Sequence, residues 1–392
     1  MIDTAKTIGT KSTYNPKEIS SFLSEGVIRS IPNLERAILS LEYLGQLVEE
    51  GLDLIFKGGS AVQVILSSKR GIWTRLSVDA DICVDLSREE FENVLERVFQ
   101  KFDKEGFSYS QRAARISSEI PFYLYRIETP PITDLSRVFL LDAMGIKPEF
   151  STVQTPLKTP FFDSQVEIVT PTVGALIGDK ISTIGPTTIG RQLVDSRNGL
   201  EYAKHFHDIN QLIKLDFSFK ECAEAYYEAV AIQSRVRGRK FTPGECFDDL
   251  VFTCQVASLP PQVGDEIIEK KLQSRKEQRA RAHSEFRILR RGLQRFLPFL
   301  VRGMSYAWDD IRFYAARTAL LANMINNKMN GEKAMELLTS DFSTRKEDIL
   351  RLIKQIESLS DEERWFIEKS EIKNFPKVLK TWHDFFFVED LM

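Results

Sequence analysis

The stretch RLSVDADICVDL, residues 75–86, decides the fold, because apolar and polar side chains alternate along it with hardly a fault. Successive side chains of an extended chain point to opposite faces, so this alternation predicts a strand that buries one face. The apolar face carries Leu76, Val78, Ala80, Ile82, Val84 and Leu86. The other face carries Arg75, Ser77, Asp79, Asp81 and Asp85. The strand therefore sets two carboxylates two residues apart on its polar face.

The acidic pair predicts a metal site. Neighbouring residues on one face of a strand lie about 7 Å apart, so Asp79 and Asp81 can converge on one ligand. Two carboxylates at that spacing repel each other unless a cation lies between them. Magnesium suits the site, because this hard ion takes one or two carboxylates and completes its shell with water and phosphate oxygens. The alternative is that both aspartates simply face solvent, since Asp-x-Asp is a common pattern.

A glycine turn precedes this strand. The sequence FKGGS, residues 56–60, links a predicted strand at 52–56 to a predicted helix that begins near Ser60. Two glycines let the backbone approach a ligand closely, and the N–H groups at the start of a helix attract an anion. The turn thus predicts a phosphate site, although a glycine pair also forms ordinary tight turns. It is not a Walker loop, because no Gly-Lys-Ser/Thr follows a four-residue gap.

The rest of the chain divides into an α/β part and a helical part. Periodicity and turn residues predict helices at 33–51, 87–102 and 171–184, strands at 122–129, 137–146 and 166–170, and a loop at 155–165. Ser87 is the expected N-cap of the second helix. Residues 201–232 and 243–392 are almost wholly helical in pattern, with breaks at Pro243, Pro260, Pro261, Pro298 and Pro376. We therefore predict a lead at 1–30, an α/β domain at 31–170 and a helical domain at 171–392.

Composition narrows the classes of function. The chain has 392 residues, of which 43% are hydrophobic, and a net charge of −3; this fits packed globular cores and argues against an overall basic coat for nucleic acid. The four cysteines and four histidines show no zinc-binding spacing. We find no apolar leader and no run of 18 apolar residues, so we expect a cytoplasmic protein that makes no membrane contact.

One stretch is strongly basic despite the negative net charge. Residues 270–302 contain eleven lysines and arginines against two acids, Glu277 and Glu285, and residues 234–241 add four more basic residues. Such a stripe could follow a phosphate backbone. The alternative is a solvated helical face that pairs with acidic residues elsewhere in the chain.

The order of strand, Gly-Gly-Ser, helix and Asp-x-Asp strand resembles the nucleotidyltransferase fold of the polymerase β superfamily. The motif FKGGSAV followed by RLSVDADI is similar to the motifs of the AbiEii/AbiGii toxin branch of this superfamily, to which the MenT-type toxins also belong. That branch favours Lys-Gly-Gly-Thr/Ser-Ala, matched here by Lys57, Gly58, Gly59, Ser60 and Ala61. It also favours Arg-x-Ser-x-Asp-Ile-Asp, matched by Arg75, Ser77, Asp79 and Asp81, with Ala80 in place of isoleucine. The resemblance covers roughly residues 50–215. It implies an α+β fold, in which a mixed sheet with helices precedes a mostly helical domain.

The resemblance also implies roles for individual residues. Nucleotide binding is implied for Lys57, Gly58, Gly59, Ser60, Arg75 and Ser77. Metal binding and catalysis, with Mg²⁺ or Mn²⁺, are implied for Asp79 and Asp81. In family members that use two metals a further acid lies on a neighbouring strand, and Asp142 is the best candidate, ahead of Glu128 and Glu167. Asp142 could equally cap the turn at Gly145.

Two later residues extend the resemblance. The family carries a lysine on the helix after the third strand, which corresponds to Lys180 in GALIGDKI. It also carries a late aspartate after a basic residue, which corresponds to Asp208 in AKHFHDINQLI, with His207 where an arginine often stands. These matches imply that Lys180 contacts the incoming nucleotide and that Asp208 belongs to the active site, where it could orient or deprotonate the attacking hydroxyl. Without the resemblance, both would pass as ordinary helix-surface residues.

Together these matches imply a nucleotidyltransferase toxin of a toxin–antitoxin system. It would transfer a nucleoside monophosphate from ATP, CTP or GTP to the 3′ end of tRNA, release pyrophosphate and block translation. A cognate antitoxin would restrain it, and phage defence is a role to expect. Two alternatives stay open: transfer to a protein hydroxyl, and a non-catalytic scaffold that only binds nucleotide.

Overall fold

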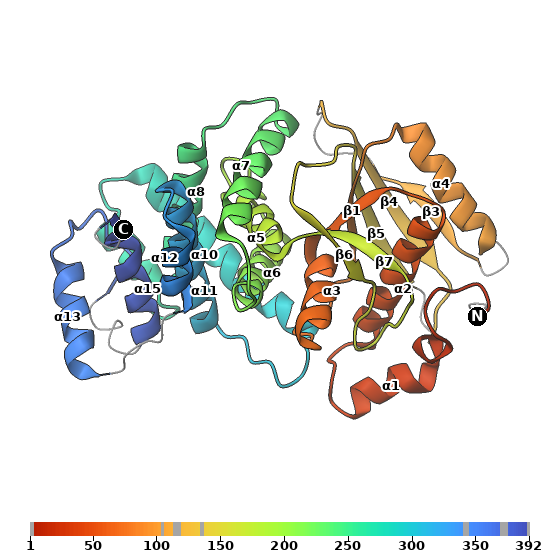
Figure 1. Ribbon diagram of the computed structural model, residues 1–392. Coiled ribbons are helices and arrows are strands. Elements are labelled where there is room, and N and C mark those ends of the chain that lie inside the picture. The colour runs from red at the N-terminus through yellow and green to blue at the C-terminus, as the bar shows by residue number, and fades with distance from the viewer. Residues whose placement is uncertain are drawn as a thin grey trace. The chain divides into compact units, whose positions relative to one another are not determined.

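A computed structural model describes residues 4–102, 106–112, 119–133, 137–339, 345–368 and 375–389. The chain forms two compact units (Figure 1). The sheet unit comprises Met1–Leu176, Ala231–Lys240 and Pro298–Ser305. The helical unit comprises Ile177–Val230, Phe241–Leu297 and Tyr306–Met392.

The sheet unit contains a mixed five-stranded sheet. Its strands are β1 (Leu54–Lys57), β2 (Ala80–Val84), β3 (Ser108–Gln111), β4 (Phe122–Thr129) and β5 (Arg137–Met144), in the order β1-β2-β5-β4-β3. The central pair β2 and β5 is parallel, and the other pairs are antiparallel. A second, antiparallel pair joins β6 (Thr152–Pro156) to β7 (Glu167–Pro171). The expected α+β fold with a mixed sheet is therefore confirmed.

Three details differ from the sequence-based prediction. The strand predicted at 75–86 is shorter in the structure, where β2 covers only Ala80–Val84. Arg75, before β2, forms an isolated β-bridge with Leu300 instead. The backbone N–H of Leu76 donates to the carbonyl of Phe299 at 2.7 Å. Strands β3 and β6 were not predicted, because both are polar and largely exposed and so carry no apolar alternation.

Helices α2 (Ile31–Glu49) and α4 (Arg88–Lys101) cover the apolar face of the sheet (Figure 1). On α2, Tyr43 packs its ring against Phe99 of α4 and Phe139 of β5, with centroid distances of 5.4 and 5.8 Å. Helix α4 begins as predicted, with Ser87 and Glu90 forming a reciprocal capping box. With its apolar face buried in this way, the sheet presents Asp81 of β2 on its other side.

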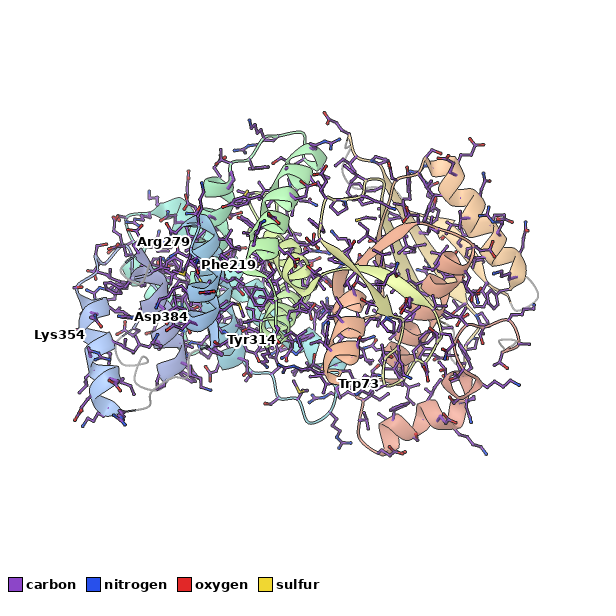
Figure 2. All side chains as sticks on the ribbon, viewed as in Figure 1. Trp73, Phe219, Arg279, Tyr314, Lys354 and Asp384 are labelled. Atoms are coloured by element: carbon purple, nitrogen blue, oxygen red, sulfur yellow. The ribbon has the colours of Figure 1, made fainter. Side chains whose placement is uncertain are left out.

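The segment between α3 (Gly58–Arg70) and β2 is anchored by an aromatic cluster. Trp73, which is labelled in Figure 2, lies 5.9 Å from Phe22 of α1 (Pro16–Ser24) and 5.0 Å from Phe161, measured between ring centroids. The segment that leads into the acidic strand is thereby held on the body of the sheet unit.

The helical unit is built from α6 (Ser196–Leu212), α8 (Pro243–Ala257), α9 (Gly264–Lys271), α10 (Lys276–Phe296), α11 (Trp308–Asn326), α12 (Gly331–Thr339), α13 (Lys346–Glu357) and α15 (Pro376–Phe386), with parts of α5 (Val173–Ser182) and α7 (Phe219–Val236). Pro243 and Pro376 are first residues of helices, as expected for predicted breaks. Within the described ranges, we find no helix with the length and apolarity needed to span a membrane.

Candidate active site

The glycine turn joins β1 to α3 directly. Strand β1 ends at Lys57 and α3 begins at Gly58. The first N–H groups of a helix lack partners within the helix, and a lysine N-cap has no side-chain acceptor to offer them. The start of α3 therefore has the backbone donors and the positive dipole end that bind phosphate groups.

Both glycines are required by close contacts with the acidic strand segment. Gly58 has a φ of +72°, and a Cβ added there would overlap the carboxylate of Asp81. A Cβ on Gly59 would overlap the guanidinium of Arg75 and lie 2.6 Å from the hydroxyl of Ser77. The structure thus brings the two sequence motifs into direct contact, so that the Asp81 carboxylate lies against the start of α3.

Hydrogen bonds fasten the first turn of α3 to the residues before β2. The hydroxyl of Ser60, which is only 1% exposed, donates to the carbonyl of Asp79 at 2.7 Å. The side chain of Gln63 accepts from the backbone N–H of Ser77 at 3.0 Å. Because the Ser60 hydroxyl is used inside the protein, its backbone N–H is the group that it can offer to a phosphate.

Asp81 shares one face of the sheet with Asp142, and Asp79 lies directly before β2. Asp81 is paired with Asp142 in the parallel register of β2 and β5, so their side chains leave the same face side by side. Asp142 also forms an ion pair with Arg112, and Asp79 accepts from the backbone N–H of Leu140 at 3.3 Å. Repulsion between the neighbouring carboxylates is thus partly offset by a guanidinium.

The two other candidates for a third ligand lie elsewhere. Glu128 is an exposed residue near the end of β4 and pairs with Arg126 at 3.1 Å. Glu167 begins β7 in the separate two-stranded sheet. Of the three acids considered from the sequence, Asp142 is therefore the one that neighbours Asp81.

The acidic face suits a metal that arrives with phosphate. In the part of the chain that the structure describes, no group of three or more His, Cys, Asp or Glu side chains has the arrangement of a metal site. Mg²⁺, however, commonly uses one or two carboxylates and takes its remaining oxygens from water and phosphates. The hard oxygen atoms of Asp79 and Asp81, next to the N-terminus of α3, fit that requirement.

An apolar cluster closes one end of the acidic face. Cys83 follows Asp81 by two residues on the same face but is fully buried. It packs in a cluster with Ile55, Ile120, Met144, Ile232 and Val236, of which the last two come from the end of α7. The open part of the face is therefore limited to the beginning of β2. Sequence patterning gave no sign of this cover, because α7 is distant in the chain.

Lys180 and Asp208 form a buried ion pair within the helical unit. The Nζ of Lys180 on α5 lies 2.8 Å from the Oδ2 of Asp208 on α6, and the side chains are 3% and 1% exposed. Neither residue is therefore an ordinary helix-surface residue, and their assignment to the active site stays a prediction. His207 lies beside the pair, with its Nδ1 3.7 Å from Asp208 Oδ1, and its ring packs edge-on against Phe296 and Tyr306.

A second histidine, His205, lies in the electrostatic field of this ion pair. Burial, reinforced by the positive charge of Lys180, lowers the pKa of His205 to about 3. His205 is therefore neutral at physiological pH. Its Nδ1 is buried and, within the described residues, makes no hydrogen bond. Sequence analysis did not single out this residue, since its environment depends on a lysine 25 positions away.

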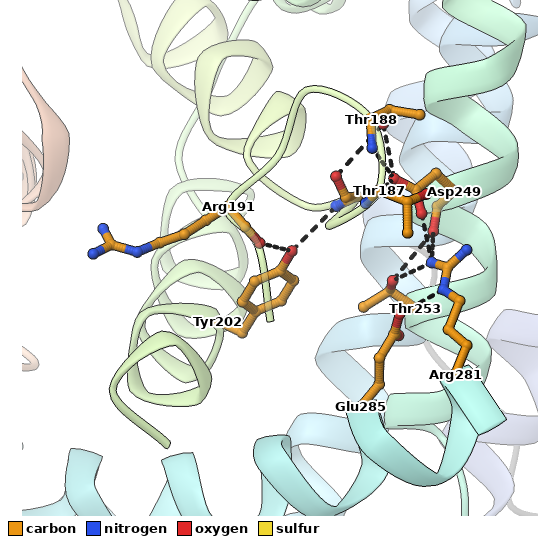
Figure 3. Close-up of polar contacts among 9 residues, drawn as sticks. Thr187, Thr188, Arg191, Tyr202, Asp249, Thr253, Arg281 and Glu285 are labelled. Carbon is orange, nitrogen blue, oxygen red and sulfur yellow. Dashed lines mark hydrogen bonds and ion pairs between the residues drawn. The ribbon is translucent and has the colours of Figure 1, made fainter. Parts of the chain in front are cut away.

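The loop after α5 is held by a polar network (Figure 3). The backbone N–H groups of Thr187 and Thr188 and the Thr188 hydroxyl all donate to Asp249 on α8 at 2.8 Å. Arg281 on α10 bridges Asp249 to Glu285, and burial raises the pKa of Glu285 to about 7. This network fixes the loop that follows the helix bearing Lys180.

The chain is similar to known proteins over most of its length. The family model described as nucleotidyl transferase AbiEii toxin, Type IV TA system, matches residues 42–312. Among solved structures, the chain is similar to MenT4, a nucleotidyltransferase toxin from Mycobacterium tuberculosis, with 13% sequence identity and a TM-score of 0.39, over 82% of this chain and 98% of that chain. No curated protein matches the sequence.

Proposed function

The chain belongs to the AbiEii family of nucleotidyl transferase toxins, and from this membership we propose that it transfers a nucleoside monophosphate from an NTP to the 3′ end of tRNA. The reaction uses Mg²⁺ or Mn²⁺ and releases pyrophosphate. It stops translation until a cognate antitoxin intervenes, and it serves in phage defence. The observation that supports the proposal most strongly is the contact between the Asp81 carboxylate and the glycine turn at the start of α3.

The triphosphate binds at the start of α3. The N–H groups of Gly58, Gly59 and Ser60 donate to its oxygens, and the helix dipole adds to the attraction. Lys57 and Arg75 supply positive charge next to these groups, and Arg75 is held in place by a hydrogen bond from its Nη1 to the carbonyl of Leu76 at 3.0 Å. Ser77, whose hydroxyl approaches Gly59, completes the phosphate-binding edge.

Asp79 and Asp81 would hold the metal beside the glycine turn, with Asp142 as the third candidate. The bound ion supplies charge stabilisation on the phosphate oxygens. The glycine turn holds the triphosphate beside these carboxylates, which leaves the α-phosphate open to in-line attack by a hydroxyl of the acceptor. Because the Asp81 side chain contacts the turn itself, one small region positions both the phosphates and the metal.

Lys180 and Asp208 act as a pair. Lys180 stabilises negative charge on the nucleotide, a role that rests on the family resemblance. The ion pair at 2.8 Å favours Asp208 as the residue that positions Lys180, rather than as a general base. One carboxylate oxygen of Asp208 is already occupied by the Lys180 ammonium group.

Transfer of label from NTPs marked at the α-phosphate tests this function. The purified protein with Mg²⁺ or Mn²⁺ is expected to label tRNA, and Asp81→Asn is expected to abolish labelling while Asp85→Asn retains it. Asp85 is the matched control, because it lies on the same strand segment but is exposed and away from the turn. Label on protein instead of tRNA would favour a protein hydroxyl as acceptor. Undiminished growth arrest by Asp81→Asn in cells would favour a nucleotide-binding scaffold.

A further inference from the structure

The basic stretch at 270–302 divides into two halves with different surroundings. In the first half, basic side chains pair with acids of the helical unit. The pairs are Lys271 with Asp361, Arg275 with Glu362, Arg279 with Glu269, and Arg281 with Asp249 and Glu285. Arg279, labelled in Figure 2, lies 3.3 Å from Glu269. For these four residues the structure favours the alternative of a face that pairs with acidic residues elsewhere in the chain.

The second half of α10 presents arginines that are not neutralised. Arg287, Arg290, Arg291 and Arg295 are all exposed, and we call them the arginine face. Among the residues that the structure describes, no ion pair joins any of the four to an acid. The Cζ of Arg290 lies 5.5 Å from the ring centroid of Phe286. The sequence contains no Asp or Glu between residues 286 and 308.

Packing against α6 fixes the direction of this face. A Cβ on Gly199 of α6 would overlap the carbonyl of Ile288, and a Cβ on Gly292 of α10 would overlap the backbone of Gly199. The two helices therefore meet backbone to backbone. Because Gly292 is held there and Phe286, Leu289 and Phe296 are buried, α10 cannot rotate its arginines inward.

The spacing of the arginines makes a continuous stripe. Arg287, Arg291 and Arg295 follow one another at four-residue intervals, which correspond to steps of about 6 Å along the helix axis. Like charges at this spacing destabilise a helix by about 0.2 to 0.5 kcal/mol per pair, and the negative end of the helix dipole offsets part of that cost. A stripe kept without acidic partners is suited to an external polyanion.

We propose that the arginine face binds the phosphate backbone of the acceptor RNA, an inference that rests on the proposed function for its choice of RNA as acceptor. A guanidinium binds phosphate through two parallel hydrogen bonds, so the four arginines of this face offer repeated bidentate contacts. Such contacts position the backbone without reading the base sequence. The face therefore gives affinity for tRNA as a class, and selection among tRNAs is made elsewhere.

The salt dependence of RNA binding tests this proposal. The variant carries R287Q, R290Q, R291Q and R295Q, and the control carries R275Q and R279Q, which remove paired basic residues of the same helical region. Fluorescence anisotropy measures the Kd of labelled tRNA from about 0.05 to 0.3 M salt for both proteins and the wild type. Binding of a fluorescent NTP analogue and thermal unfolding report on the nucleotide site and on folding.

The association constant K for RNA falls with salt, and we expect the steepness of log K against log salt to decrease by about 2.8 to 3.6 in the variant, since each of four phosphate contacts contributes about 0.7 to 0.9. At about 0.1 M salt, a loss of four such contacts corresponds to a Kd that is weaker by roughly 600-fold to 4,000-fold. The control is expected to keep most of the wild-type slope. NTP binding is expected to be unchanged in both.

Each failure has a distinct meaning. An unchanged slope in the variant would overturn the proposal and leave the proposed function standing. A variant that loses RNA binding, found together with a wild type that transfers no nucleotide, would uphold the arginine face and overturn the proposed function. If the wild type binds no tRNA but an acidic protein binds to the arginine face, the RNA proposal is wrong.

Discussion

Replacing Gly58 by alanine separates the backbone requirement of the turn from its contact with the acidic strand. Gly58 has a φ of +72°, and an added Cβ would overlap the Asp81 carboxylate. Gly71, at the other end of α3, is the matched control. It has a φ of +62° with nothing within 4 Å of an added Cβ. The two substitutions therefore share the conformational cost, and only the first displaces Asp81.

The shared cost of a left-handed conformation for alanine is about 1 to 2 kcal/mol. We expect Gly71→Ala to lower the free energy of unfolding by this amount and to leave nucleotide transfer near the wild-type level. Gly58→Ala is expected to lose stability by at least as much, because the Asp81 side chain must also leave its position. Its transfer rate is expected to fall by roughly 10²-fold or more, as a 1 Å displacement of a positioned group can cause.

Urea unfolding and a label-transfer assay measure the two effects on the same preparations. Rates are compared at a temperature where both variants remain folded. Equal activity of Gly58→Ala and Gly71→Ala would refute the reasoning, since it would mean that the contact between the turn and Asp81 has no part in transfer.

Two further predictions concern the helical unit. Lys180→Met or Asp208→Leu alone should lower the free energy of unfolding by about 3 to 5 kcal/mol, because each leaves a buried charge without its partner. In a double-mutant cycle, the double variant should recover much of this loss. Additive losses in the cycle would contradict the pairing. The pKa of His205 is lowered to about 3 in the folded protein, against about 6.5 in the unfolded chain. Between these pH values the unfolded chain binds more protons than the folded protein. The free energy of unfolding should therefore fall as the pH drops from 6.5 towards 3, by at most about 1.4 kcal/mol per pH unit. His205→Phe should flatten this part of the pH profile of unfolding, and an unchanged profile would contradict the burial of a neutral imidazole.

The sequence predicted those parts of the fold that depend on local pattern. Strand β4 and helix α4 show clear periodicity and a cap, and both were found at their predicted positions. Strand β3, SYSQ, has no apolar side to bury, so its position depends on pairing with β4. Pattern alone could not identify such an edge strand.

For the candidate site, too, the sequence predicted the contacts between recognisable motifs but not the long-range contacts. Gly58 and Asp81 are 23 positions apart, but each lies in a recognisable motif, and their order suggested that they meet. The pairing of Lys180 with Asp208 joins two different helices and leaves no periodic trace. The cover of Cys83 by Ile232 and Val236, likewise, results from packing between distant segments. Long-range contacts of this kind follow from the tertiary fold rather than from local propensity.

The central claim is that Asp81 and the glycine turn bind one metal–nucleotide complex. A crystal structure with Mn²⁺ and a non-hydrolysable NTP analogue, with the metal located by its anomalous scattering, tests this claim most directly. The account predicts the metal on the carboxylates of Asp79 and Asp81 and the phosphates on the N–H groups of Gly58 and Gly59. Metal and phosphates bound together at another place, with this face of β2 empty, would contradict it.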